Sequence, residues 1–211
     1  MRRKVNLSVY LAPMRGQQQE AESAARGGRG ARKRILEAAA RLFYRDGINA
    51  TGVERLASEA AVSKRTLYQH FPSKSAVVEE YLRGMQQWVG DPVSPTARDT
   101  DRTPRARLLA VFDRSLPAGQ LRGCPFHNAA VEAAEAMPEV QDIVHHHKRE
   151  FIDSLIALAK QAGATNPRLL GQQLAVLYEG AAALGTSLDD PAPWTHARKA
   201  AQILIDQALK K

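Results

Sequence analysis

The side chains best able to recognise another molecule lie close together between Ser63 and Lys74, where basic, hydroxyl, amide and aromatic groups are concentrated. Arg and Lys can donate paired hydrogen bonds to guanine, Gln can pair with adenine, and a Thr methyl fits against thymine. Tyr, His and Lys also donate to phosphate oxygens. This chemistry predicts contact with double-stranded DNA. The residues expected to make it are Ser63, Lys64, Arg65, Thr66, Tyr68, Gln69, His70 and Lys74.

Two helices and a short turn must position these groups. Thr51 is followed three positions later by Glu54, the pattern of a capping box, which predicts that a helix begins at Thr51. Ser63 predicts the start of the second helix, with Val62 and Leu67 packed together as a hydrophobic staple. The turn between the helices is then about three residues long, as a helix-turn-helix requires.

The expected DNA contacts divide into two roles. Because the second helix turns Leu67 and then Phe71 inward, its polar residues face outward, where a groove could receive them. The side chains expected to approach base edges are Lys64, Arg65, Thr66 and Tyr68. Those expected to contact phosphates are Thr51, Ser63, His70 and Lys74.

Flanking helices are expected on both sides of this pair. The run Ala31–Asp46 has a helical apolar stripe and stops at Gly47, a typical C-terminal cap. Ser73 predicts the start of another helix, whose free N–H groups would attract a phosphate beside Lys74. Three basic residues at the start of the first helix complete the expected contacts: Arg32, Lys33 and Arg34.

The net charge of +8 is concentrated at the N-terminus. Residues 1–34 hold nine Lys or Arg and two Glu, whereas residues 89–211 hold fourteen of each sign. Residues 1–30 are rich in Gly, Gln and Arg without apolar periodicity, so we expect a disordered basic arm. Such an arm can follow phosphates or enter the minor groove. The alternatives are a solvated tail, or a natural start at Met14.

Composition excludes several other classes. The chain is 44% hydrophobic and 25% charged, as expected for a globular protein, and no stretch approaches the roughly 20 apolar residues of a membrane span. Cys124 is the single cysteine, which rules out an internal disulfide. We therefore expect a cytoplasmic, nucleoid-associated protein with no membrane partner.

Residues Ile35 to Leu82 resemble the TetR family of bacterial transcriptional regulators. The resemblance is carried by ILEAAARLFYRDG, TGVERLA and, most specifically, VSKRTLYQHFPSK from Val62 to Lys74. One departure is Ala61, in the turn, where family members usually have Gly. If that position needs a positive φ, Ala costs roughly 1 kcal/mol relative to Gly.

Everything after Arg32 reads as helix or loop, so the predicted fold class is all-α. Beyond the helix that Ser73 begins, helices are expected over about 105–116, 125–136, 138–162, from Asn166 and Pro167 onward, and over 194–209. The predicted domains are the arm, a three-helix helix-turn-helix DNA-binding head at 31–77, and a C-terminal helical ligand-binding and dimerisation domain at 78–211. Nine helices, three in the head and six in the body, agree with what the resemblance implies.

The resemblance implies that the body binds an unknown small-molecule effector and that the last two long helices form a homodimer. Gly180–Ala183 would allow close helix approach there, although an intramolecular contact explains it too. Helix order alone gives the pocket residues, each equally well explained by core packing. They are Met85, Trp88, Phe112, Leu116, Cys124, Phe126, His127, Val131 and Phe151.

Other functions find less support in the residues. Cys124, His127 and His145–His147 could belong to a metal sensor, but consecutive helical residues point about 100° apart. Cys124 could sense oxidants, or be a small buried hydrophobe at a helix start. No Gly-rich phosphate loop, GxSxG or HExxH motif is present, so no enzyme, catalytic residue, metal or cofactor is predicted. The alternative to an effector-responsive repressor is a nonspecific nucleoid DNA binder using the same head and arm.

Overall fold

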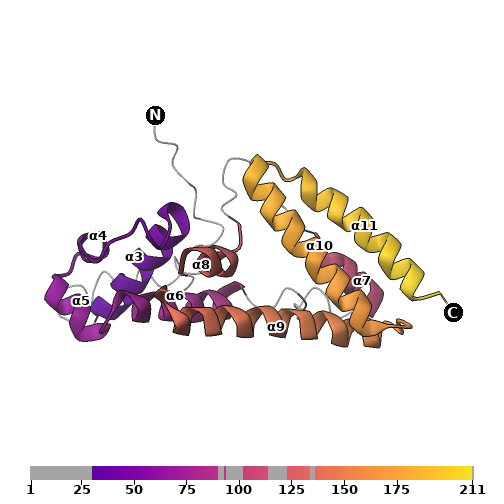
Figure 1. Cartoon of the computed structure of the whole chain (residues 1–211), viewed down its shortest axis with the longest axis horizontal. Coiled ribbons are helices and arrows are strands. Elements are labelled where there is room, and N and C mark those ends of the chain that lie inside the picture. Colours follow the sequence, from indigo (N-terminus) through magenta and orange to yellow (C-terminus); the bar gives the residue numbers. More distant parts are fainter. Residues whose placement is uncertain (1–29, 90–92, 94–101, 114–122, 134–135, 211) are drawn as a thin grey trace. The chain divides into compact units, whose positions relative to one another are not determined.

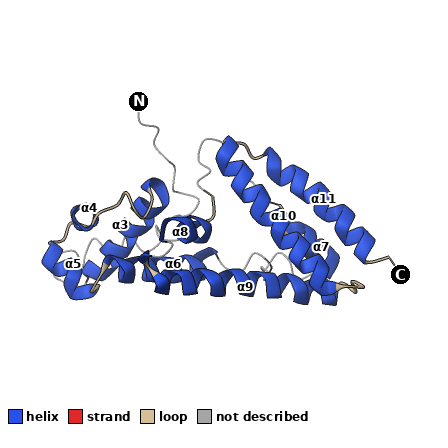
Figure 2. Cartoon of the chain, in the orientation of Figure 1, coloured by secondary structure: helices blue, strands red, loops and turns tan. Residues whose placement is uncertain are grey.

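A computed structural model describes residues 30–89, 93, 102–113, 123–133 and 136–210. Within these ranges the chain forms nine α-helices and no strand (Figures 1 and 2), which confirms the all-α prediction. Residues 1–29 of the predicted arm and Leu116 lie outside the described residues, and so does the side chain of Trp88. The helices are α3 (Ala31–Asp46), α4 (Val53–Glu59), α5 (Lys64–His70), α6 (Lys74–Val89), α7 (Pro104–Ala110), α8 (Pro125–Ala133), α9 (Pro138–Gln161), α10 (Pro167–Leu188) and α11 (Ala192–Ala208).

The helices belong to two compact units. The first contains Met1–Val89 and Pro125–Val144, and the second contains Gly90–Cys124 and His145–Lys211. α8 and the first part of α9 therefore belong to the same unit as the predicted DNA-binding helices. None of the described helices is long and apolar enough to span a membrane.

The core of the first unit is built on α3, which contacts α4, α5 and α6. Ile35 and Leu42 of α3 are almost fully buried, as are Leu56 of α4 and Leu67 of α5. Phe43 packs edge-on against Tyr81 of α6, with ring centroids 5.5 Å apart. α4 and α5 have seven residues each, too short to be stable alone, so their apolar contacts with α3 must hold them.

The capping box predicted at Thr51 is wrong. α4 begins at Val53 after Gly52, and no side chain caps it. The Thr51 hydroxyl instead donates to the carbonyl oxygen of Gly47 at 2.8 Å, and Thr51 is fully buried. A buried carbonyl oxygen without a donor would be destabilising, so the hydroxyl is used inside the turn between α3 and α4.

The turn between α4 and α5 is closed by a Schellman motif. The Val62 N–H donates to the Ala57 carbonyl at 3.0 Å, and the Ala61 N–H donates to the Ser58 carbonyl at 3.1 Å. Ala61 between them has a φ of 50°, in the left-handed region that favours Gly. The residue that departs from the family pattern therefore does adopt a positive φ.

The other predicted caps of this unit are confirmed. The Ser63 side chain accepts from the backbone N–H of Thr66 at 3.0 Å, at the start of α5. Ser73 accepts from the N–H of Ala76 at 3.1 Å, at the start of α6. Gly47 follows α3 with a φ of 98°. Each cap acts within four residues, so local sequence was enough to find it.

The second unit is centred on an aromatic cluster around Tyr178 of α10. Its ring centroid lies 5.0 Å from that of Trp194, 4.9 Å from that of Phe151 and 6.3 Å from that of Phe112. Phe151, Tyr178 and Trp194 join α9, α10 and α11 into one core, and Phe112, just after the end of α7, adds the fourth ring. α10 and α11 run antiparallel and lie side by side (Figure 1).

Gly171 allows α10 to approach α9 closely. A Cβ built at Gly171 would lie 2.5 Å from Ile156 Cγ1 and 2.8 Å from the Ile156 backbone nitrogen. The predicted cap at Asn166 is confirmed, since its side chain accepts from the Leu169 N–H at 3.1 Å. α7 ends at Ala110, earlier than the predicted 116, and α11 begins at Ala192, two residues before the predicted start.

Candidate DNA-binding interface

α5 presents the expected groups on its outer face. Leu67 faces the core, whereas Lys64, Arg65, Gln69 and His70 are exposed. Tyr68 is 47% exposed, which is unusual for so large a side chain. The periodicity of the helix therefore places the residues predicted from sequence on one accessible surface.

Three of these side chains are unengaged. Among the residues that the structure describes, no intramolecular hydrogen bond or ion pair involves the side chains of Arg65, Gln69 or His70. Nothing has to be broken before they contact another molecule. Arg and Gln are also the residues that make paired hydrogen bonds to guanine and adenine, respectively.

Lys64 is held by Glu54 of α4. Its ammonium lies 2.5 Å from a Glu54 carboxylate oxygen, and both side chains are exposed. This hydrogen bond raises the pKa of Lys64 and lowers the pKa of Glu54. Solvent and salt weaken such exposed pairs, so Lys64 can exchange Glu54 for a nucleic-acid acceptor.

Thr51 and Thr66 are less accessible than predicted. Thr51 is buried inside the turn between α3 and α4, so it is withdrawn from the set of expected phosphate contacts. The Thr66 hydroxyl lies 2.9 Å from that of Ser63, and its backbone N–H already donates to Ser63. Ser63 and Thr66 thus shape the start of α5 directly.

The basic residues at the start of α3 have structural partners. Arg32 pairs with Glu80 of α6, and its guanidinium lies 5.3 Å from the centre of the Phe71 ring. Arg34 donates to the carbonyl oxygen of Ala60 at 3.1 Å. Both therefore tie α3 to neighbouring segments, while Lys33 is exposed.

Lys74 is half-buried at the start of α6 instead of projecting freely. Desolvation lowers the pKa of its ammonium, and the nearby carboxylate of Glu132 on α8 acts in the opposite direction. The ammonium of Lys74 therefore already interacts with a carboxylate of its own unit.

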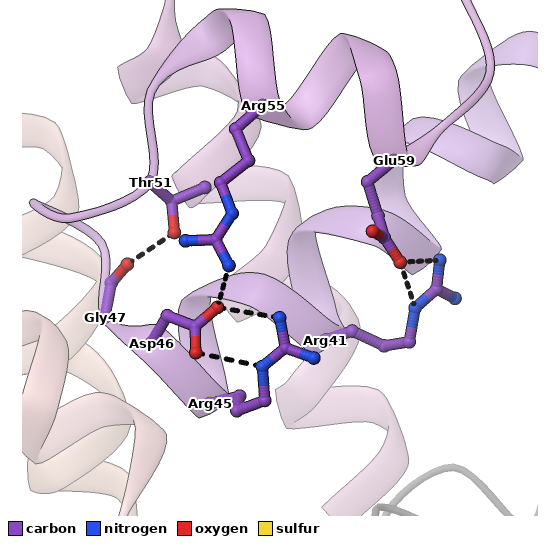
Figure 3. A network of polar contacts seen from close by, with 7 residues as sticks. All are labelled: Arg41, Arg45, Asp46, Gly47, Thr51, Arg55 and Glu59. Atoms are coloured by element: carbon purple, nitrogen blue, oxygen red, sulfur yellow. Dashed lines mark hydrogen bonds and ion pairs between the residues drawn. The ribbon is translucent and has the colours of Figure 1, made fainter. Parts of the chain in front are cut away.

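A polar seam joins α3 to α4, and the sequence analysis did not anticipate it (Figure 3). Asp46 accepts hydrogen bonds from Arg45 at 2.9 and 2.8 Å and from Arg55 at 2.5 Å. Arg41 pairs with Glu59 at 3.2 Å. The hydrogen bond to Arg45 lowers the pKa of Asp46 and raises that of Arg45. Opposite charges on α3 and α4 were visible in the sequence, but their pairing depends on how the helices cross.

The predicted pocket residues have diverse environments. Met85 and Phe126 are buried in the first unit, and Phe112 and Phe151 are buried in the second. His127 is exposed, and Val131 is 67% exposed, so these two side chains do not line an interior pocket in this structure. Both lie on the outer face of α8, which helix order alone did not reveal.

Cys124 is only partly buried, which corrects the expectation of a buried hydrophobe. The ammonium of Lys148 lies 3.6 Å from its sulfur and 2.5 Å from a carboxylate oxygen of Glu179. The Nε2 atom of His146 lies 3.1 Å from a carboxylate oxygen of Glu150. Across the described ranges, no group of three or more His, Cys, Asp or Glu side chains could hold a metal ion.

Two protein families match most of the chain. One is described as bacterial regulatory proteins, tetR family, and matches residues 35–81. The other is described as tetracyclin repressor-like, C-terminal domain, and matches residues 104–201. The first match contains α4 and α5, and the second begins at α7 and ends within α11.

Curated relatives match over a shorter stretch. The HTH-type transcriptional repressor KstR2 of Mycobacterium tuberculosis is 39% identical over 91 residues, which are 41% of this chain and 43% of that protein. The HTH-type transcriptional activator FasR of Mycolicibacterium smegmatis is 37% identical over 112 residues, 48% of this chain and 50% of that protein. The chain thus spans half or less of the length of each of these curated relatives.

The similarity to a solved structure extends over nearly the whole fold. A TetR transcriptional regulator from Streptomyces avermitilis superposes with a TM-score of 0.76 and 32% identity, covering 84% of this chain and 97% of that one. Both the helix-turn-helix and the helical body are therefore shared. The chain belongs to the TetR family of bacterial transcriptional regulators.

Proposed function

We propose that this TetR-family regulator is a homodimeric repressor that binds a near-palindromic operator and is released from it by a small molecule. The observation that carries the proposal is the outer face of α5, where Arg65, Gln69 and His70 are exposed and lack partners among the described residues. A side chain without an internal partner can bind DNA without first losing a contact.

The proposed contacts have separate roles. Arg65 and Tyr68 approach base edges, with Lys64 joining them once it leaves Glu54. His70 and the exposed Ser63 lie at the two ends of α5, where they can donate to phosphates. Base contacts supply sequence preference and phosphate contacts supply affinity that depends on salt.

The outer faces of α10 and α11 support a homodimer. Val176 is 72% exposed and Ile203 is 59% exposed, and Leu184 and Leu188 are exposed as well. Gly180 lies on the same face of α10, and a Cβ added there would meet nothing within 4 Å. Exposed apolar residues of this kind mark association surfaces. The buried Ala181 instead packs in the core of its own unit.

The dimer surface can be tested with Gly180→Arg. The protomer tolerates the added side chain because the space beside Gly180 is open. We expect a folded monomer, with its molar mass measured by light scattering after size-exclusion chromatography and its helical content measured by circular dichroism. A variant that remains dimeric would contradict this surface. Ala157→Arg, at an exposed position of α9, is the control for the added charge.

A two-fold dimer constrains the operator. Two identical heads separated by about one turn of DNA, roughly 34–36 Å, require half-sites related by inversion. An effector that favours a different head spacing must weaken DNA binding by the same coupling free energy.

The deciding experiment is in-vitro selection from a random duplex library at moderate salt, followed by sequencing of the bound pool. A palindromic consensus supports the proposal. Binding without a consensus would favour a nonspecific nucleoid protein, and no binding would contradict both. Because the relatives include a named repressor and a named activator, a reporter placed behind the selected operator then decides the sign of regulation.

A further inference from the structure

α8 is tied to the turn that precedes α4 by two hydrogen bonds. The backbone N–H of Asn49 donates to a carboxylate oxygen of Glu132 at 2.9 Å. The Asn49 side-chain amide donates to the backbone carbonyl of Glu132 at 2.8 Å. The two residues are 83 positions apart in sequence. Because each residue donates or accepts through both backbone and side chain, the contact fixes the direction of the turn as well as its distance from α8.

The rest of the turn is fitted to the same carboxylate. A Cβ at Gly47 would lie 2.8 Å from one Glu132 carboxylate oxygen and 3.1 Å from the other. The Gly47 carbonyl is itself held by the buried hydroxyl of Thr51. Residues 47–51 therefore form a closed turn with the Glu132 carboxylate against one side of it.

This turn is the start of the predicted DNA-reading pair. Thr51 is separated from α4 by Gly52 alone, and the Schellman motif at Ala61 connects α4 to α5 with little freedom. A shift of the turn would therefore change the direction of α4 and, through it, the direction of the face that carries Arg65. The similarity of α5 to the TetR family does not predict this restraint, because the restraint comes from α8.

We propose that Glu132 is a positioning residue for sequence-specific DNA binding and acts through Asn49. It does not touch DNA in this proposal, which rests on the proposed operator binding by α5. Glu132 holds the turn in one orientation, and α5 then presents its side chains in one register to base edges. Without the carboxylate, the turn adopts a wider range of orientations. Base contacts need aligned donors and acceptors and are lost, whereas phosphate contacts tolerate the change.

The test compares binding to the selected operator with binding to a scrambled duplex of the same length, by fluorescence anisotropy. For Glu132→Ala we expect an operator affinity about tenfold lower and a scrambled-duplex affinity within about twofold of the unmodified protein, because each good base pairing contributes discrimination of that order. The specificity ratio therefore falls. A merely structural role would lower both affinities together.

Two further variants separate the hydrogen bond from the charge. Glu132→Gln keeps an oxygen that can accept from Asn49 but removes the charge near Lys74. We expect Glu132→Gln to retain most of the specificity ratio of the unmodified protein. Asn49→Ala removes only the side-chain donor and should lower the ratio about threefold, an intermediate loss since one of two hydrogen bonds remains. If Glu132→Ala fails to fold, Asn49→Ala carries the test.

Each outcome decides the proposal. Glu139→Ala, which removes an exposed carboxylate at the start of α9, is the matched control and should leave the ratio unchanged. If the unmodified protein prefers its operator but Glu132→Ala and Asn49→Ala retain the full ratio, the positioning role is overturned and the proposed function stands. If the unmodified protein has no operator preference, both proposals fail.

Discussion

Different interactions stabilise the interior of each compact unit. In the second unit, long helices surround an aromatic cluster in which Tyr178 contacts Phe112, Phe151 and Trp194. In the first unit, the short helices α4 and α5 depend on side-chain and turn hydrogen bonds and on an exposed polar seam as well as on apolar contacts. A DNA-reading surface must keep its polar groups outside, so the helices that carry it contribute few side chains to a core.

This contrast predicts that core substitutions in the second unit mainly change stability, whereas surface substitutions in the first mainly change binding. The largest effect is expected at the centre of the aromatic cluster. Tyr178→Ala removes a ring that contacts three others, so we expect a loss of about 3–5 kcal/mol in the free energy of unfolding. Urea denaturation measures it. Asp153→Ala, at an exposed position of α9, is the control and should change stability little.

Close helix packing gives the next effect. Gly171→Ala places a Cβ 2.8 Å from the Ile156 backbone nitrogen, where rotation of a side chain cannot relieve the clash. We expect a loss of about 1–3 kcal/mol, seen as a lower melting temperature. Gly84→Ala, in α6 and with nothing within 4 Å of the added Cβ, is the control and should not destabilise the protein. Equal melting temperatures for the two variants would show that α9 and α10 are not packed this closely.

Arg65→Ala is expected to change DNA binding without changing stability. We expect about 1–3 kcal/mol less discrimination at one operator position and an unchanged melting temperature, because Arg65 is exposed and has no partner among the described residues. His70→Ala should instead weaken binding to all duplexes by a similar factor, because it removes a contact with phosphate and not with a base. Selection from a random library distinguishes the two patterns. Identical behaviour of both variants would contradict the division between base and phosphate contacts.

Ala61→Gly tests the strain in the turn between α4 and α5. Since Ala61 has a φ of 50°, we expect Gly to stabilise the protein by about 1 kcal/mol. Thermal melting measures the gain. Ala50→Gly is the control, an exposed turn residue without a positive φ, and should not be stabilising. A loss of stability in Ala61→Gly would mean that the left-handed conformation is not strained.

The smallest effect is the pH dependence of the polar seam. The pKa of Asp46 lies below its ordinary 3.8 because Arg45 and Arg55 favour the carboxylate. Asp46 therefore stabilises the fold above about that pH and loses this contribution as pH falls through the lowered folded-state value. Asp46→Asn should cost about 0.2–1 kcal/mol at pH 7 and less at pH 2. Urea midpoints at both pH values check this, and an equal loss at pH 2 would exclude an ionic origin.

The contrast between the units also explains which features were predictable. The caps at Ser63, Ser73 and Asn166 and the end of α3 at Gly47 were predicted correctly, because each involves groups within four residues of one another. The outward face of α5 was predictable for the same reason, since helical periodicity alone turns Leu67 inward.

Contacts between segments distant in the chain could not be read in this way. The sequence predicted that Thr51 caps α4, but its hydroxyl donates to the buried carbonyl oxygen of Gly47. The charges of Lys64 and Lys74 were visible, while their engagement by Glu54 and Glu132 depends on helix crossings. Local hydrogen bonds follow from spacing along the chain, whereas hydrogen-bond partners across 83 residues follow only from how the helices pack.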